Sequence, residues 1–84
     1  MSYRVIIDKV AKKYIDSQPP HQQDRIMSAI AKLPYTGDIR QLKGRKGLYG
    51  LRVGDYRIIY RIDKGRLLVI VTDANSRGRI YRNI

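Results

Sequence analysis

Residues 49–61 constrain the fold more than any other stretch, because they have the pattern of two β-strands joined by a tight Gly54-Asp55 turn. Side chains along a strand point alternately to opposite faces of a sheet. One face is apolar and aromatic and holds Tyr49, Leu51, Val53, Tyr56, Ile58, Tyr60 and Ile62. The other face holds Leu48, Gly50, Arg52, Arg57, Ile59 and Arg61. The stretch therefore predicts a hairpin that buries its tyrosine face in a core and presents guanidinium groups to a phosphate-bearing partner.

Two amphipathic helices are expected before this hairpin. Residues 3–7 form a β-branched run that predicts a short first strand, and Asp8 follows at a position suited to a helix N-cap. Apolar residues then recur at helical spacing, which predicts a helix of about three turns that ends before Pro19-Pro20. A second apolar series over residues 26–33 predicts another helix, with the prolines in or before its first turn. The two would form a helical hairpin.

The segments around the hairpin complete the predicted sheet. Residues 38–47 are expected to form a basic loop whose glycines let the backbone approach a partner. Residues 63–65 predict a hairpin turn, and residues 67–71 are apolar without alternation, as in a central strand covered on both faces. Residues 72–79 have the composition of a polar loop, and residues 80–82 of a short final strand or tail.

Helices and strands in separate blocks predict a single α+β domain spanning residues 1–84. We expect an N-terminal strand, a two-helix hairpin and then a mostly antiparallel sheet of three or four strands, with the helices on one face. The first strand is expected at an edge beside the hairpin strands. The face opposite the helices is expected to be less covered and positive.

Composition limits the chemistry open to the chain. It has no cysteine, one histidine and seven acidic residues, all aspartate. Disulfides, thiol catalysis and thiolate metal sites are therefore excluded, a histidine-rich metal site is not expected, and no cofactor is implied. His21 lies far in sequence from the other candidate residues, which indicates a surface histidine. Arginine, lysine and tyrosine are left to carry the chemistry.

The net charge of +11 on 84 residues is the strongest global feature of the chain. Such a field attracts polyanions, so nucleic acid, ribosome, an anionic membrane or an acidic protein are the expected targets, and a solvated basic surface is the alternative. No apolar run reaches transmembrane length, and the N-terminus lacks the layout of a signal peptide. We therefore expect a cytoplasmic protein with no membrane partner.

Three motifs, in order along the chain, resemble the RelE/ParE superfamily of small bacterial and archaeal toxins. Residues 41–44 read Gln-Leu-Lys-Gly, and residues 48–60 read Leu-Tyr-Gly-Leu-Arg-Val-Gly-Asp-Tyr-Arg-Ile-Ile-Tyr. Together they are similar to the family pattern L-x-G … Y-x-x-R-x-G-x-Y-R-x-x-Y. Residues 77–82 read Arg-Gly-Arg-Ile-Tyr-Arg, which is similar to the family ending R-x-x-x-Y-R. The resemblance covers nearly the whole chain.

The resemblance to the RelE branch implies a toxin that is a metal-independent endoribonuclease. Such enzymes, mRNA interferases, cleave ribosome-bound mRNA and inhibit translation. The ribose 2′-OH attacks its own 3′-phosphate, which leaves a 2′,3′-cyclic phosphate and a free 5′-hydroxyl. The resemblance also implies a cognate antitoxin that holds the toxin silent in a toxin–antitoxin hetero-oligomer.

The same resemblance assigns roles to individual residues. Arg57 would stabilise the scissile phosphate, Arg77 would assist there or at the leaving group, and Tyr81 would stack on or orient the nucleotide. Arg52 stands where the family commonly has a basic residue, usually lysine. The expected RNA-binding residues are Lys43, Arg45, Lys46, Arg61 and Arg79. The alternative to these functional roles is that Arg57, Arg61 and Arg79 are only exposed charges and that Tyr81 is an aromatic residue of the core.

Two departures from the family bear on proton transfer. Relatives with fast cleavage carry lysines where this chain has Gly50 and Arg52, and some carry a histidine just before Arg77. Arginine stays protonated at ordinary pH, so Arg52 is a poor proton acceptor. The step would fall to a lysine of lowered pKa, such as Lys43 or Lys46, or to the ribosome or the substrate itself.

Two other functions fit the same residues less well. A ParE-type toxin shares the fold and inhibits DNA gyrase without catalysis, but that branch usually lacks the arginine–tyrosine set. An inactive basic RNA- or ribosome-binding module is the third reading.

Overall fold

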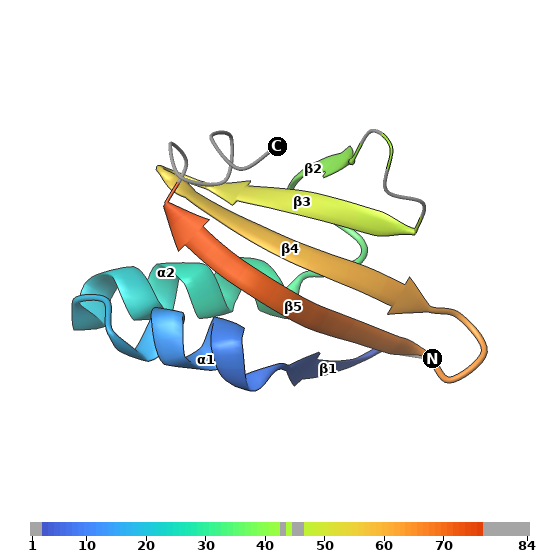
Figure 1. Ribbon diagram of the computed structural model, residues 1–84, viewed down its shortest axis with the longest axis horizontal. Helices are drawn as coiled ribbons and strands as arrows, with labels where there is room; N and C mark the ends of the chain where they lie inside the picture. Colours follow the sequence, from blue (N-terminus) through green and yellow to red (C-terminus); the bar gives the residue numbers. More distant parts are fainter. Residues whose placement is uncertain (1–2, 43, 45–46, 77–84) are drawn as a thin grey trace.

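The computed structural model describes residues 3–42, 44 and 47–76, and in Figure 1 the helices pack against one face of the sheet. The chain order is β1 (Arg4–Ile7), α1 (Lys9–Asp16), α2 (Pro20–Ala31), β2 (Asp38–Gln41), β3 (Leu48–Val53), β4 (Tyr56–Asp63) and β5 (Leu68–Ser76). The strands lie in the order β1-β5-β4-β3-β2. The α+β prediction with helices on one face is therefore confirmed, with five strands in the part of the sheet that the structure describes.

Both helices start as the sequence indicates. Asp8 occupies the N-cap position of α1, although its side chain makes no capping hydrogen bond. Helix α1 has 8 residues and ends at Asp16, about one turn shorter than predicted, because the chain leaves the helix at Ser17 before the prolines. Pro20 is the first residue of α2, where the missing N–H of proline would have no helical partner anyway. Neither helix of the described ranges is both long and apolar enough to span a bilayer.

The edges of the sheet differ from the predicted arrangement. Strand β1 lies at an edge, as predicted, but it pairs in parallel with β5 and does not touch the hairpin strands β3 and β4. Residues 38–41, expected to be a loop, form the opposite edge strand β2, antiparallel to β3. A short strand with a single apolar residue, Ile39, has little local signal that separates it from a loop.

Strand β5 runs on to Ser76, through residues expected to be a loop. Its pairing with β4 shifts between Ile59 and Tyr60, because Thr72 is an extra residue on β5. Such a bulge reverses which face the later residues point to. Val69, Val71 and Ala74 are thus buried, whereas Leu68 and Ile70 are only half-buried, so β5 is central but is not sealed on both faces.

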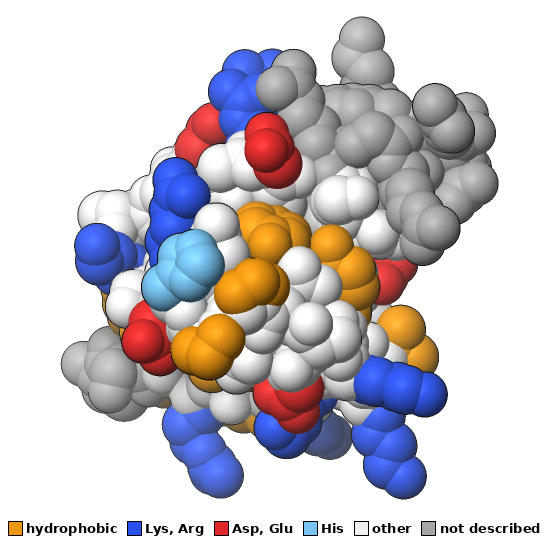
Figure 2. Space-filling view, turned by 90° about the vertical axis from the view of Figure 1, so that its left-hand side faces the viewer, with side chains coloured by type: hydrophobic (Ala, Val, Ile, Leu, Met, Phe, Trp, Pro, Cys, Tyr) orange, Lys and Arg blue, Asp and Glu red, His pale blue; other side chains and the backbone are white. Residues whose placement is uncertain are grey.

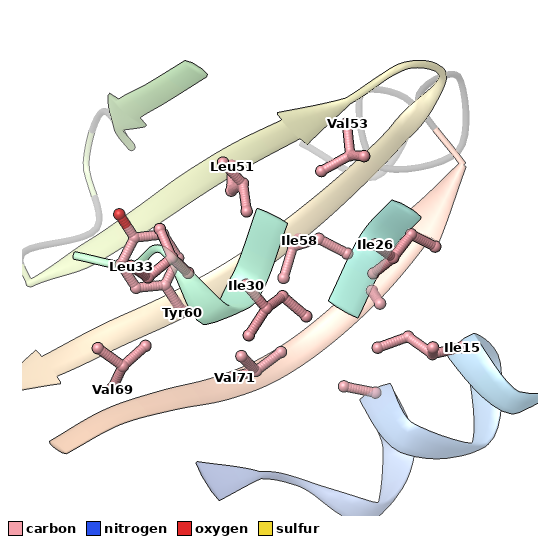
Figure 3. Close-up of a cluster of buried hydrophobic side chains, with 12 residues drawn as sticks. Ile15, Ile26, Ile30, Leu33, Leu51, Val53, Ile58, Tyr60, Val69 and Val71 are labelled. Atoms are coloured by element: carbon pink, nitrogen blue, oxygen red, sulfur yellow. The ribbon is translucent and has the colours of Figure 1, made fainter. Parts of the chain in front are cut away.

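The core lies between the helices and the apolar face of the sheet (Figure 3). Tyr60 is 1% exposed, and its ring stacks on Tyr49 with centroids 5.6 Å apart. Tyr49 and Tyr56 also pack against the core, so the core assignment of these three tyrosines is confirmed. Burial raises the pKa of Tyr60 to about 12, and the neighbouring Tyr49 adds to the rise.

The substitution Ile58→Ala should lower the free energy of unfolding by about 2–5 kcal/mol, because Ile58 is 0% exposed and the deletion leaves a cavity. Ile6→Ala is the matched control, since Ile6 in β1 is 46% exposed, and it should cost less than about 1 kcal/mol. Urea denaturation of both variants measures the difference. Equal losses would contradict the placement of the core.

Tyr60 should ionise near pH 12 in an absorbance titration at alkaline pH. Because its pKa in the folded chain is raised, its contribution to stability is complete below pH 10 and is lost as the pH rises toward 12. Tyr60→Phe should remove the transition near pH 12 and flatten this loss of stability. Tyr35→Phe, at an exposed tyrosine, should leave both unchanged.

Candidate functional site

The face of the sheet opposite the helices carries a row of polar side chains across four strands. Residues directly opposite each other in an antiparallel pair point to the same face, with Cβ atoms about 4.5–5.5 Å apart. Successive pairing partners across β2, β3, β4 and β5 are Asp38, Arg52, Arg57 and Asn75. The sheet therefore brings Arg52 and Arg57 side by side, as the sequence predicts.

Arg52 is held by the edge strand. Its Nε donates a hydrogen bond to Oδ2 of Asp38 at 3.1 Å, and the same two atoms form an ion pair between half-exposed side chains. Part of the positive charge of Arg52 is thus offset within the protein. Asp38 was not a predicted site residue, because its segment was assigned to a loop.

Arg57 is more covered than expected. Only 6% of it is exposed, and Ile59 on the same face is 9% exposed, so the prediction of an open positive face is wrong at its centre. Gly50 makes this arrangement possible. A Cβ built on Gly50 would lie 3.4 Å from Cδ of Arg57, 3.5 Å from Nη1 of Arg57 and 3.4 Å from Cδ2 of Leu42. The side chain of Arg57 therefore lies over a strand position that has no side chain.

These residues surround a small, narrow depression. Its walls are Asp38, Arg40, Gly50, Arg52 and Arg57, and it encloses no water-sized volume. Three arginines and one aspartate give it a positive charge. A surface of this shape suits an anion that rests on it, such as a phosphate with guanidinium donors on two sides, better than a small molecule enclosed within it.

The other predicted site residues are distributed as follows. Arg61 lies on the same face of β4 but is exposed, pairs with Leu48 and Ile70, and does not line the depression. Lys43, Arg45, Lys46, Arg77, Arg79 and Tyr81 lie outside the described residues. Arg40, like Asp38, was missed as a wall residue. No local signal identifies either residue, because one apolar residue between two charged ones is too short a pattern to separate a strand from a loop.

A second, larger cavity lies beside the Gly54-Asp55 turn that joins β3 to β4, on the side of the sheet that the helices cover. It has a volume of about 260 Å³ and is lined by residues of α1, α2, the turn and the end of β5. The Oη of Tyr56 donates to Oε1 of Gln18 at 2.9 Å, which holds the strand to the connection between the helices. Gly54 has φ +59°, as the first central residue of a type II′ turn requires, and a Cβ there would lie 3.1 Å from Nη1 of Arg25.

Figure 2 shows the end of the molecule on which the two helices connect, with the one histidine at the surface. His21 is exposed, so its assignment as a surface residue is confirmed. Among the residues whose placement is described, no three histidine, cysteine, aspartate or glutamate side chains gather into a group that could hold a metal ion.

Comparison with known proteins agrees with the motifs. A family model described as the ParE toxin of the type II toxin–antitoxin system parDE matches residues 5–81. Toxin RelG of Mycobacterium tuberculosis is 29% identical over 91 residues, covering 98% of this chain and 99% of the relative. Both alignments extend over nearly the whole chain.

Solved structures of toxins share the fold. The RelE chain matched in the RelE–RelB complex of Pyrococcus horikoshii is 31% identical, with a TM-score of 0.79 over 94% of this chain and 99% of that one. The RelB–RelE complex of Methanococcus jannaschii gives 26% identity and a TM-score of 0.76 over 94% and 98%. The isolated RelE toxin of Escherichia coli, at 15% identity and a TM-score of 0.75, shares the fold over 99% and 100%. The chain therefore belongs to the RelE/ParE superfamily of toxins of type II toxin–antitoxin systems.

Proposed function

We propose that this toxin is an endoribonuclease that cleaves mRNA on the ribosome and so inhibits translation. The observation that carries the proposal is the pair of neighbouring arginines, Arg52 and Arg57, at a small positive depression. Two guanidinium groups on adjacent strands match the oxygens of one phosphodiester, which each can bind with two parallel hydrogen bonds.

The chemistry assigned to the site is attack of the 2′-oxygen on the adjacent phosphorus. The P–O5′ bond breaks, and the products are a 2′,3′-cyclic phosphate and a 5′-hydroxyl. Negative charge builds up on the phosphoryl oxygens in the transition state, and fixed cations at that place lower the barrier. Arg57 takes this role with Arg52 as electrostatic support, while Arg77 and Tyr81 serve the leaving group and the nucleotide by family resemblance.

Binding to the ribosome and mRNA draws on the charge of the whole chain. A protein of net charge +11 gains affinity for nucleic acid by releasing counterions from it, whatever the sequence. Lys43, Arg45, Lys46, Arg61 and Arg79 are assigned to backbone contacts of this kind.

A cognate antitoxin is the second proposed partner. The solved relatives from Pyrococcus horikoshii and Methanococcus jannaschii are toxin–antitoxin complexes. A toxin that destroys message must be restrained in its own host, and an acidic or amphipathic protein segment would complement a strongly basic surface.

Arg57→Ala should lower mRNA cleavage by about 10²-fold or more, the loss typical for one donor to transition-state charge. Arg57→Lys should recover little, because an ammonium lacks the planar fork. The measurement is primer extension on messages from induced cells, where codon-phased cuts are expected. Arg66→Ala is the matched control. It also removes one positive charge, but in the exposed β4–β5 turn outside the depression, and it should cleave mRNA as the wild type does. Full cleavage activity of the Arg57→Ala variant would contradict the proposed function.

Gly50→Val should reduce cleavage by up to about 10²-fold, whereas Gly50→Ala should keep most of it. A single Cβ meets Arg57 at 3.4 Å, an ordinary contact, but the branched methyl groups of valine would occupy the space of the arginine stem and displace its guanidinium. Valine favours a strand, so circular dichroism should show that the fold is kept. A Gly50→Val variant as active as the wild type would contradict the role of this glycine.

The matching family model favours one competing function, because its description is that of a ParE toxin. A toxin of that kind would inhibit DNA gyrase by binding, without cleaving RNA. Induced cells would then accumulate DNA breaks while their messages stay intact. Message cleavage would be absent from cells that express the wild type and from cells that express Arg57→Ala. The same primer-extension experiment, run beside a DNA-break assay, separates the two functions.

A further inference from the structure

We infer that Asp38 is a positioning residue for the proposed cleavage, one that orients Arg52 so that Arg52 and Arg57 face the same phosphate. The inference rests on the proposed function and deepens it. Asp38 has no place in the family motifs of the sequence. Its case stands on the contacts of the edge strand β2.

The hydrogen bond to Asp38 occupies one of the three guanidinium nitrogens of Arg52. Within the described ranges, Nε is the one guanidinium nitrogen of Arg52 that donates to a protein acceptor, at 3.1 Å to Asp38 Oδ2. Guanidinium is planar, so fixing the direction of Nε–H also fixes the plane in which Nη1 and Nη2 lie. The four N–H bonds on these two atoms are then left for a ligand.

Asp38 also counters a repulsion that the sheet creates. Arg52 and Arg57 are direct cross-strand partners, and like charges at such positions repel. An arginine side chain with several rotatable bonds would turn outward into water to escape this repulsion. Because Asp38 is the partner of Arg52 on the side away from Arg57, its carboxylate offsets the repulsion and holds the guanidinium against the sheet.

Stability does not explain this ion pair. The side chains of Arg52 and Asp38 are 37% and 45% exposed, and exposed pairs contribute little to folding. Removing Asp38 should therefore leave the fold intact, so that effects on the reaction can be measured in a folded protein.

The position of Asp38 is itself built into the backbone. Gly37, the residue before β2, has φ +134°, and a Cβ there would lie 2.7 Å from Cδ1 of Leu51. Only glycine therefore fits without displacing this core residue. The neighbouring Ile39 pairs with Leu51 and packs against the core, which turns Asp38 toward the arginine face.

The test is a double-mutant cycle on steady-state cleavage of message on programmed ribosomes. Asp38→Ala should lower kcat by about tenfold or more, with KM unchanged or lower, because a misdirected guanidinium slows the chemistry while the loss of a negative charge favours RNA binding. Asp38→Asn should recover most of the rate, since its amide oxygen still accepts the Nε–H bond. In an Arg52→Ala background, Asp38→Ala should have no further effect.

Asp16→Ala is the matched control. It breaks another exposed ion pair, Lys12–Asp16 at 3.0 Å on α1, and should change neither kcat nor KM. Thermal melting should show all of these variants folded. Unchanged or faster cleavage by Asp38→Ala, equal loss in Asp38→Asn, or additive losses in the double mutant would overturn the inference alone. No cleavage by the wild type, or full cleavage by Arg57→Ala, would overturn the proposed function and the inference with it.

Discussion

The antiparallel pairing of β3 with β4 is the interaction on which the rest of the structure depends. Its register runs from Leu48 opposite Arg61 to Val53 opposite Tyr56, and it assigns every side chain of both strands to one of two faces. A slip by one residue would turn Ile58 and Tyr60 away from the helices and push arginines into the core. The same hydrogen bonds therefore secure the core and aim the arginines, so folding and the proposed function share one constraint.

The positions of Arg52 and Arg57 depend on neighbouring residues that leave room for a side chain or supply a negative charge. Gly50 has no side chain, so Arg57 can lie over this position of β3, and the carboxylate of Asp38 forms an ion pair with Arg52. Two guanidinium groups side by side repel each other, so a site that is to hold them ready for a phosphate needs both devices. In the proposed reaction their effect is preorganisation: the cost of ordering the cations is met in folding, before the RNA phosphate binds.

Most of the fold could be predicted from local patterns, and the misses share a cause. The helices and the hairpin have strong periodic signals, and they were located correctly apart from the length of α1. Strand β2 was missed because four residues with one apolar side chain carry almost no period. The partner of β1 was wrong because β5 lies some sixty residues further on, and no local pattern names a partner. The continuation of β5 was hidden by the bulge at Thr72, which interrupts the alternation that marks a strand.

The sequence by itself determined the two-faced hairpin, the charge and the family, and with them the placement of Arg52 and Arg57 on one face of the sheet. Periodicity and motifs act over a few residues, and these features need no more than that. Tertiary structure alone decided that Asp38 stands beside Arg52, that Arg57 is buried over Gly50, and that the depression has Arg40 in its wall. Those contacts join segments that meet only when β2 pairs with β3 and β3 with β4, and an alternating pattern specifies the face of a side chain but not its neighbour on the next strand.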